Sequence, residues 1–283
     1  MATIGITGGR GMLGSDIKVK AEADGYNVNI YDLPEFDLRD KKNIDEIVEA
    51  NDIIINCAAY TAVDKAESEK ELCEEINAEV PGKIGKLAAE QNKYVVHIST
   101  DFVFGDNSSD PLNELSPANP LSIYGSTKLN GEKNLIDSGC LNAIIRVQWT
   151  YGKNGNHFVS KIIELANKMP ELKVVADQYG APTPTTAAAD AVICFIKKQI
   201  TGLYHFAADG YTNRYETAKF ILNEMNINIP LSPCDSSCFP APAKRPLNSR
   251  FDCSKIDQVL DFKRPDWKDA MKKFIADNYH GQH

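Results

Sequence analysis

Thr3-Ile-Gly-Ile-Thr-Gly-Gly-Arg-Gly-Met-Leu-Gly14 is the stretch that decides the predicted fold of this chain. A short apolar run, Thr3–Thr7, leads into glycines at positions 8, 11 and 14, and a helical pattern over Ser15–Asp24 follows. Glycines at this spacing allow a tight turn and the close approach of a diphosphate, while the helix N-terminus supplies unpaired N–H groups. The stretch therefore predicts a dinucleotide-binding loop between a first strand and a first helix.

Asp32 ends the next strand-like run, Tyr26–Asp32. A carboxylate at this place accepts hydrogen bonds from an adenosine ribose, which favours NAD over NADP. Arg10 lies within the glycine loop and is a candidate contact for a 2′-phosphate. The sequence therefore predicts NAD(P)H as the cofactor and leaves the choice between its two forms open. A tight turn that binds nothing is the alternative.

Strand-like runs and helical patterns alternate through the first half of the chain. The strand-like runs are Asp52–Ala58, Tyr94–Ser99 and Asn142–Gln148, and the helical patterns are Glu71–Asn92 and Ser122–Ser138. This alternation favours an α/β fold of the Rossmann type, a doubly wound parallel sheet with helices on both faces. Residues 1–150 are expected to form this dinucleotide-binding domain.

The second half of the chain has shorter elements and carries most of the prolines. This change predicts a second, smaller α/β domain over residues 151–283 that mainly binds the substrate. The helical pattern at Ala187–Lys198 is a candidate to return to the first sheet. Segments of the second half are therefore expected to rejoin the first domain.

Composition disfavours several classes of protein. The 283-residue chain carries a net charge of −8, whereas nucleic-acid binders usually present a basic surface. No apolar run approaches the roughly 20 residues of a membrane span. The seven cysteines are irregularly spaced, which favours neither a zinc site nor a disulfide framework. With no signal-peptide pattern at the N-terminus, a cytoplasmic protein is expected.

Tyr124 and Lys128 are four residues apart in a predicted helix and therefore share one face. A lysine ammonium there is expected to lower the pKa of the phenol from about 10 toward neutrality, so that it exchanges a proton with a substrate oxygen. Thr100 or Ser99, at a strand end, would polarise that oxygen. The same spacing at residues 215–219 has no hydroxyl-bearing strand end just before it and predicts an ordinary amphipathic helix.

Longer motifs surround these residues. They are Thr7-Gly-Gly-Arg-Gly-Met-Leu-Gly14, Asn56-Cys-Ala-Ala-Tyr-Thr-Ala-Val-Asp-Lys-Ala-Glu67, Ile76-Asn-Ala78, Ser99-Thr-Asp-Phe-Val-Phe104, Tyr124-Gly-Ser-Thr-Lys-Leu-Asn-Gly-Glu132, Asp177-Gln-Tyr-Gly-Ala-Pro-Thr183 and Lys244-Arg-Pro-Leu-Asn-Ser249. On these motifs the chain resembles, over nearly its whole length, the extended short-chain dehydrogenase/reductase family. The resemblance implies an oxidoreductase that reduces the 4-keto group of a sugar nucleotide to give a dTDP-6-deoxy-L-sugar, with hydride from NAD(P)H and a proton from Tyr124.

The resemblance also implies roles for individual residues. The catalytic residues would be Tyr124, Lys128 and Thr100. The cofactor would contact Gly8, Gly11, Met12, Leu13, Gly14, Asp32, Asp37, Leu38, Ala59, Tyr60, Thr61, Ser99, Tyr124 and Lys128. The substrate would contact Thr61, Val63, Thr100, Asp101, Trp149 and Arg245. Trp149 would pack against the sugar, with a core or interface aromatic as the alternative. Arg245 would reach the diphosphate, with a surface charge as the alternative.

Some positions depart from the family pattern. Arg146-Val-Gln-Trp149 stands where the family usually has Arg-Thr-Ser-Trp, which removes two hydroxyls near the sugar and leaves the exact sugar open. Phe102 replaces the usual tyrosine after Ser-Thr-Asp. Some members hold a magnesium ion between subunits, and Asp16 lies near one such position, but the other acidic residues have no match. No metal is therefore predicted, and a homodimer is expected from the family.

Two other functions stay open. One is another sugar-nucleotide enzyme, an epimerase or a 4,6-dehydratase. Dehydratases of this superfamily carry Thr-Asp-Glu, and here Phe102 takes the place of the glutamate, which disfavours dehydration. A non-catalytic regulatory subunit, like the β subunit of methionine adenosyltransferase, would share much of the cofactor site, and Asp252-Cys-Ser-Lys255 fits it. Trp149 and the motif over Asp177–Thr183 favour the reductase.

Overall fold

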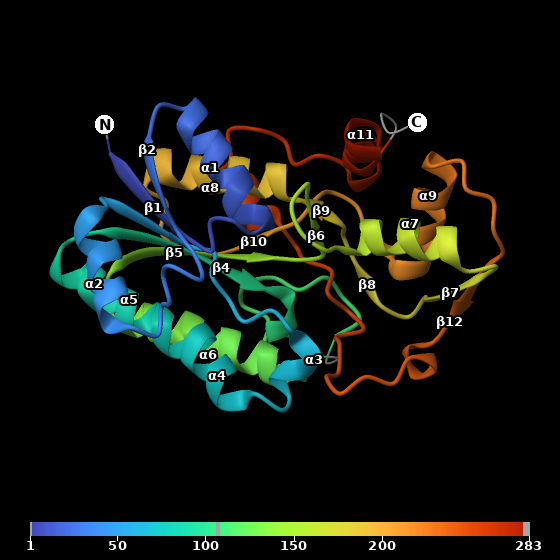
Figure 1. Ribbon diagram of the computed structural model, residues 1–283, viewed down its shortest axis with the longest axis horizontal. Helices are drawn as coiled ribbons and strands as arrows, with labels where there is room; N and C mark the ends of the chain where they lie inside the picture. Colours follow the sequence, from blue (N-terminus) through green and yellow to red (C-terminus); the bar gives the residue numbers. More distant parts are fainter. Residues whose placement is uncertain (1, 106–107, 280–283) are drawn as a thin grey trace.

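A six-stranded parallel sheet forms the centre of the computed structural model, which describes residues 2–105 and 108–279 (Figure 1). Its strand order is β10-β5-β4-β3-β1-β2. The strands are β1 (Thr3–Thr7), β2 (Asn27–Tyr31), β3 (Ile53–Asn56), β4 (Tyr94–Thr100), β5 (Leu141–Val147) and β10 (Gly202–Phe206). The order reverses at β1, since β2 lies on one side of it and β3 on the other. This arrangement confirms the predicted doubly wound sheet and places a crevice at the carboxyl ends of β1 and β3.

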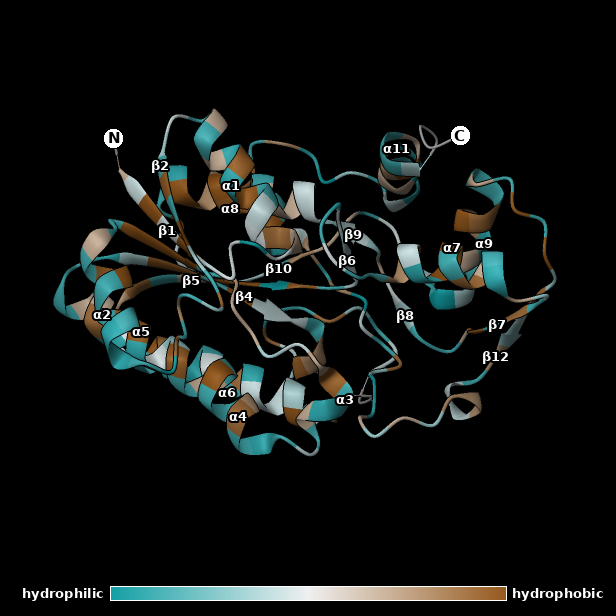
Figure 2. Ribbon diagram, in the orientation of Figure 1, coloured by the Kyte–Doolittle hydropathy of each residue, from teal (hydrophilic) through white to brown (hydrophobic). Residues whose placement is uncertain are grey.

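Helices cover both faces of the sheet (Figures 1 and 2). On one face lie α1 (Met12–Ala23) and α8 (Thr185–Lys198), and on the other lie α2 (Lys41–Ala50), α5 (Val80–Glu90) and α6 (Ile123–Asp137). Because both faces of the sheet are covered, side chains on both sides of each strand are buried and mostly apolar. In β3, for example, Ile53, Ile54 and Ile55 follow one another. Helix α1 begins at Met12, three residues before the predicted start, so the glycine loop leads directly into its first turn.

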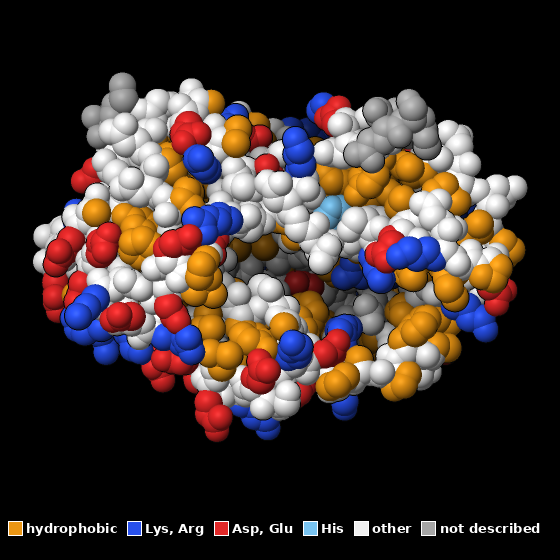
Figure 3. Space-filling model, in the orientation of Figure 1, with side chains coloured by type: hydrophobic (Ala, Val, Ile, Leu, Met, Phe, Trp, Pro, Cys, Tyr) orange, Lys and Arg blue, Asp and Glu red, His pale blue; other side chains and the backbone are white. Residues whose placement is uncertain are grey.

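A smaller lobe lies beside the sheet and leaves a hollow between the two parts on the face drawn in Figure 3. Its larger elements are α7 (Phe158–Lys168), β7 (Leu172–Val175), α9 (Arg214–Glu224), β12 (Leu231–Cys234) and α11 (Trp267–Tyr279). Its short elements are β6 (Thr150–Tyr151), β8 (Tyr179–Gly180), β9 (Thr183–Pro184), β11 (Thr212–Asn213) and the 3₁₀ turn η3 (Ser236–Cys238). Three further short elements pack on the larger lobe: α3 (Val63–Ala66) and the 3₁₀ turn η2 (Asp101–Val103) against α6, and α10 (Ser254–Asp257) against β10. Within the described residues, no helix is both long enough and apolar enough to cross a membrane.

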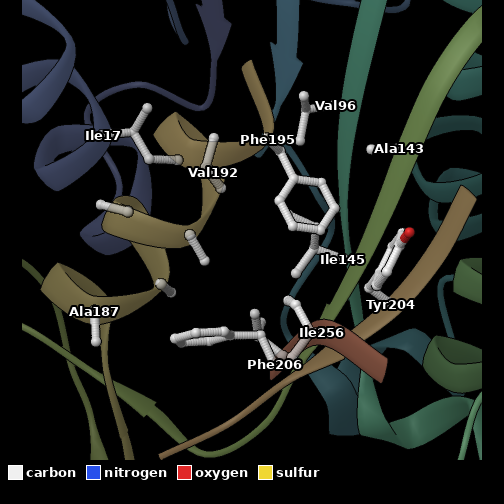
Figure 4. Packing of buried hydrophobic residues seen from close by; sticks show 14 of the residues in the cluster. Ile17, Val96, Ala143, Ile145, Ala187, Val192, Phe195, Tyr204, Phe206 and Ile256 are labelled. Atoms are coloured by element: carbon white, nitrogen blue, oxygen red, sulfur yellow. The ribbon is translucent and has the colours of Figure 1, made fainter. Parts of the chain in front are cut away.

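The second half of the chain contributes to both lobes. Helix α8 packs on α1, and β10 pairs with β5 at the edge of the large sheet. Phe195 and Val192 of α8 point toward Ile145 and Val96 of the sheet (Figure 4). Phe195 is fully buried, and truncating such a side chain to alanine costs about 3–5 kcal/mol. The site is therefore bounded by segments from both halves of the sequence.

The long helix predicted over Glu71–Asn92 is divided into three pieces. They are α4 (Lys70–Glu74), a π-helical turn η1 (Glu75–Glu79) and α5, which has Pro81 in its first turn. A proline there lacks the N–H that would continue the hydrogen-bond ladder. The wide turn carries Asn77, whose Oδ1 accepts from the backbone N–H of Tyr60 at 2.8 Å. The interruption thus anchors the segment that follows β3.

Candidate active site

The glycine loop packs closely against the segment that follows β3 and leaves no room for a side chain at Gly8 or Gly14. Gly8 has a φ of +64°, and a Cβ there would lie 2.8 Å from the backbone nitrogen of Ala58. A Cβ on Gly14 would lie 2.4 Å from the carbonyl oxygen of Gly8. Gly11 is the N-cap of α1, and no side chain caps the helix there. The first N–H groups of α1 are therefore available to an anionic group, which fits a dinucleotide diphosphate.

A cavity of about 760 Å³ lies along the carboxyl edge of the sheet. It contains most of the residues that the sequence predicted: Gly8, Gly11, Met12, Leu13, Gly14, Asp32, Asp37, Leu38, Ala59, Thr61, Val63, Ser99, Thr100, Asp101, Tyr124, Lys128 and Trp149. They come from the ends of several strands, from α1 and α6, and from the start of the smaller lobe. The cavity thus joins the glycine loop to the Tyr–Lys pair.

The structure does not bring Tyr60 or Arg245 into this cavity. The Tyr60 hydroxyl donates to the carboxylate of Glu69, because the backbone of Tyr60 is fixed by Asn77 and its ring turns toward α4. Both terminal nitrogens of Arg245 donate to the carboxylate of Asp64, at 3.1 Å and 2.8 Å. This contact lowers the pKa of the Asp64 carboxyl group. Nη1 of Arg245 also donates to the carbonyl oxygen of Ala243 at 2.8 Å, so most of its donors are occupied.

Asp32 holds the edge of the glycine loop. Its Oδ2 accepts from the backbone N–H of Arg10 at 2.8 Å, and its Oδ1 accepts from that of Leu33 at 2.9 Å. The Arg10 guanidinium donates to Glu35 at 2.7 Å on the exposed rim. Both Asp32 and Arg10 line the cavity. An acidic and a basic group thus lie together at the end of the cavity where the adenosine ribose is expected. Because the acid suits NADH and the base suits NADPH, the loop alone does not select between them.

Tyr124 and Lys128 lie one turn apart on α6, as predicted. The Ser122 side chain caps this helix by accepting from the backbone N–H of Gly125 at 3.2 Å. The Thr100 hydroxyl hydrogen-bonds the Tyr124 hydroxyl, so Thr100 and the phenol share the same end of the cavity. Hydroxyl, phenol and ammonium are therefore grouped where a substrate carbonyl would meet them.

The expected fall in the pKa of Tyr124 is not found. Burial raises the pKa of this phenol to about 12, and the hydrogen bond from Thr100 only partly offsets that effect. Burial also lowers the pKa of Lys128 to about 8. The Lys128 ammonium donates to the carbonyl oxygen of Ile98 at 2.7 Å, so part of its charge is directed at the backbone of β4. The phenol is therefore protonated at neutral pH and is arranged to act as an acid.

A buried ion pair fixes α6 on the sheet behind these groups. Arg146 of β5 contacts Glu132 of α6 at 2.6 Å and 2.9 Å, and the Ser99 hydroxyl donates to the same carboxylate. The Arg146 and Glu132 side chains are 4% and 3% exposed, so the pair is shielded from solvent. Losing one partner would leave a buried charge uncompensated, which usually costs about 3–5 kcal/mol. The pair therefore holds α6 in its place beside β4.

A second cavity of about 1220 Å³ opens from the first into the smaller lobe. The two cavities share Asp101, Phe102, Trp149, Thr150 and Arg214. Apolar side chains from α7 and β7 line the second one, together with Arg245 and Lys244. A long ligand can thus reach from the Tyr–Lys pair into the smaller lobe.

Arg214 is the functional candidate that the sequence did not reveal. Its guanidinium lies 3.7 Å from the centre of the Trp149 ring and 5.0 Å from that of Phe158. Burial lowers its pKa to about 10, and the charge of Asp101 opposes this effect. The Asn213 cap marks the start of α9, but nothing local indicates that the first residue of this helix faces the crevice.

Trp149 adopts a backbone conformation that is unusual for a large residue. Its φ is +46°, in the left-handed region that costs a non-glycine residue about 1–3 kcal/mol. Gly180 makes room for the indole, because a Cβ there would lie 2.7 Å from Trp149 Cε2. The carbonyl oxygen of Trp149 accepts from the backbone N–H of Thr183 at 3.2 Å. The motif over Asp177–Thr183 thus holds the indole between the two cavities.

Acidic residues do not form a metal centre in residues 2–105 and 108–279, where no group of three potential metal ligands occurs. Asp16, the residue considered for magnesium, lies on α1, and burial raises its pKa. A side-chain hydrogen bond with Thr185 partly offsets that effect.

Comparisons with known proteins agree with this geometry. A family model described as the RmlD substrate binding domain matches residues 2–280. The dTDP-4-dehydrorhamnose reductase of Escherichia coli K12 is 39% identical over 79% of this chain and 79% of its own length. The crystal structure of a dTDP-4-dehydrorhamnose reductase from Clostridium acetobutylicum has a TM-score of 0.93 and 34% identity, covering 97% of this chain and 98% of the other. A reductase structure from Bacillus anthracis, in complex with NADP, has a TM-score of 0.93 and 30% identity, with coverage of 98% and 99%.

Proposed function

The chain belongs to the RmlD family of dTDP-4-dehydrorhamnose reductases, and from this membership we propose that it reduces the 4-keto group of dTDP-4-dehydrorhamnose to give dTDP-L-rhamnose, with NADPH or NADH as reductant. One observation of the structure carries the proposal. Thr100, Tyr124 and Lys128 line the same cavity as the glycine loop. A cofactor loop and a proton donor therefore serve one crevice.

The residues of the chain supply the proton and the polarisation. A bound reduced nicotinamide supplies a hydride to the carbonyl carbon. The hydroxyl of Thr100 polarises the keto oxygen, and the phenol of Tyr124 donates its proton to that oxygen as negative charge develops there. The carbonyl thus gains one hydride and one proton and becomes a secondary alcohol. Lys128, one turn along α6, stabilises the tyrosinate that remains.

The sugar nucleotide would occupy both cavities. Its hexose lies near Asp101, whose buried carboxyl group lines both cavities and already interacts with Ser249 and Thr100. Its nucleoside lies in the second cavity, and the diphosphate lies where the two cavities meet. Arg214 stands at that boundary, whereas Arg245 is held by Asp64. We therefore assign the diphosphate contact to Arg214 in place of Arg245.

Phe102 argues against sugar dehydration as the reaction. It follows Asp101, where dehydratases carry a glutamate, and its ring packs edge-on against Tyr124 with centroids 5.4 Å apart. Loss of water from the sugar needs a further acid–base group beside the phenol, and a phenylalanine supplies none. Reduction needs only the hydride and the single proton of Tyr124.

A substrate panel tests the proposal. Purified protein is mixed with NADPH or NADH and with several 4-keto-6-deoxy sugar nucleotides that differ in base and in sugar, and oxidation is followed at 340 nm. We expect turnover with dTDP-4-dehydrorhamnose and a dTDP-6-deoxy-L-hexose as product. Cofactor binding without turnover on any of these ketones would favour a regulatory role. A homodimer, proposed on the family resemblance, is tested separately by light scattering.

A further inference from the structure

A buried histidine lies behind Lys128. Lys128 Nζ is 3.3 Å from His97 Nε2 and 2.7 Å from the carbonyl oxygen of Ile98. His97 is 1% exposed and Lys128 is 2% exposed. An ammonium has three N–H donors, and these contacts engage two of them. The remaining N–H is free for the crevice that Lys128 lines.

The far side of the imidazole joins a polar row across the sheet. His97 Nδ1 lies 3.1 Å from the side-chain nitrogen of Asn56, and Asn56 Oδ1 accepts from Thr7 Oγ1 at 2.7 Å. Strand register sets these residues side by side, because β1 pairs Thr7 with Asn56 and β3 pairs Asn56 with His97. All three are almost fully buried. Three neighbouring strands thus contribute one polar row that ends at Lys128.

This row has two hydrogen-bonding states. Burial and the charge of Lys128 hold the pKa of His97 well below its usual range, so the imidazole is neutral and carries one proton. When Lys128 is an ammonium, Nε2 accepts from it, and the imidazole proton is on Nδ1 and faces the Asn56 oxygen. When Lys128 is a neutral amine, its lone pair accepts from Nε2–H, and Nδ1 accepts from the Asn56 nitrogen. An amide side chain presents either atom in the same space.

We propose that His97 is a positioning residue for the reduction, which keeps Lys128 hydrogen-bonded in both of its protonation states and favours the ammonium. Other titratable groups around Lys128 are Glu132 and Tyr124 on α6, Cys57 after β3 and Cys73 on α4. Of these, the Glu132 carboxylate acts through its charge to raise the pKa of Lys128, and it is itself paired with Arg146 at 2.6 Å. Among these titratable groups and His97, it is His97 that contacts Nζ directly from the sheet, at 3.3 Å. The proposal rests on the proposed reductase function for the role that Lys128 plays.

Two substitutions with the same functional group but different reach test the proposal. His97→Gln places an amide near the Nε2 position, whereas the amide of His97→Asn reaches only the Nδ1 position and leaves Nζ without its acceptor. Loss of an acceptor from a buried ammonium favours the neutral amine. We therefore expect Lys128 in His97→Asn to lose its proton about one pH unit lower, a roughly ten-fold change in acidity. Lys128 in His97→Gln should titrate close to the wild type.

The titration is measured by NMR on protein with isotope-labelled lysine, with the Lys128 signal identified by its loss in Lys128→Met. The alkaline limb of kcat/KM should move in parallel. Tyr94→Phe is the matched control, because Tyr94 is a buried polar residue at the opposite end of the same strand, where its hydroxyl donates to Ile200. This control should leave both readouts unchanged.

Equal titration of Lys128 in the Gln and Asn variants, shifted or not, would overturn the proposal. Asn56→Ala provides a second test that keeps His97, because it removes the acceptor for Nδ1–H and should also shift the titration to lower pH. An unshifted titration in that variant counts against the polar row. The NMR measurement needs no substrate, so it tests the effect of His97 on Lys128 separately from turnover. Failure to reduce any ketone of the panel would refute the reductase function but would not decide the role of His97.

Discussion

The guanidinium of Arg214 lies 3.7 Å from the centre of the Trp149 ring, at the boundary between the cofactor cavity and the cavity of the smaller lobe. The quadrupole of an indole ring attracts a cation that lies over its face. A guanidinium stacked in this way keeps its N–H donors, which point outward in the guanidinium plane, available to an anion. The charge of Asp101, which lines the same two cavities, acts on this guanidinium and opposes the effect of burial on its pKa. The pairing thus presents a fixed cation to the crevice.

Arg214→Gln is expected to raise the KM for the sugar nucleotide by roughly 10–100-fold. The basis is the loss of charge-assisted hydrogen bonds to the diphosphate, which contribute about 1.5–3 kcal/mol. Because the diphosphate is bound equally before and during the reaction, kcat should change little. Steady-state kinetics with saturating NADPH measures both constants.

Arg245→Gln is the matched control for Arg214. Its ion pair with Asp64 is partly exposed, and pairs of this kind contribute little to stability. We expect its KM to stay within a few-fold of the wild type. A larger rise in KM for Arg245→Gln than for Arg214→Gln would return the diphosphate contact to Arg245.

Tyr124→Phe removes the proposed proton donor and keeps the ring. We expect kcat to fall at least ~100-fold, the usual scale for a general acid, while the affinity for NADPH by fluorescence titration stays unchanged. Tyr215→Phe is the control, since Tyr215 packs among apolar residues of the smaller lobe and lines neither cavity. Wild-type turnover in Tyr124→Phe would exclude the phenol as the acid.

Much of this arrangement is visible in the sequence because it is local. The glycine loop, the first strand and the first helix are contiguous, and the Tyr–Lys spacing follows from one helical turn. The rule that ligands bind at the carboxyl ends of parallel strands then brings Thr100 and Asp101 to the same crevice as Gly8. These inferences require no knowledge of how distant segments pack.

The remaining features depend on distant packing. Arg245 pairs with Asp64, 181 positions away in the sequence. Nothing in the residues next to Arg245 therefore indicates that its guanidinium is engaged by this carboxylate. Arg214 reaches Trp149 only because the smaller lobe folds back on the sheet. The pKa of Tyr124 depends on burial, a property of the folded chain, and burial raises this pKa where a fall was expected. The π-helical turn at Glu75–Glu79 likewise depends on contacts that Asn77 makes outside its helix.

Activity should decline as the pH rises through about 8. Burial lowers the pKa of Lys128 from its ordinary value of 10.5 to about 8, so the ammonium is present below that pH and lost above it. The phenol of Tyr124, with its pKa raised to about 12, stays protonated over the whole interval and does not produce the limb. A profile of kcat/KM between pH 6 and 10, assigned through Lys128→Met, measures the effect. A flat profile to pH 10 would show that the charge of Lys128 is not needed.

Two glycines of the loop should respond differently to substitution. A Cβ on Gly11 meets only the carbonyl oxygen of Gly8, at 3.2 Å, and its φ of −71° suits any residue. Gly11→Val should therefore fold with nearly the wild-type melting temperature and lose at least ~10-fold in NADPH affinity, because its side chain occupies the place of the diphosphate.

Gly14→Ala is the contrasting variant. Its Cβ would lie 2.4 Å from the carbonyl oxygen of Gly8 and 2.7 Å from Gly9 Cα, so the loop itself has to move. Overpacking of this kind costs about 1–3 kcal/mol, and the melting temperature should fall along with cofactor affinity. Thermal unfolding and fluorescence titration on both variants separate the two effects. Unchanged NADPH affinity in a folded Gly11→Val protein would mean that the diphosphate binds away from this loop.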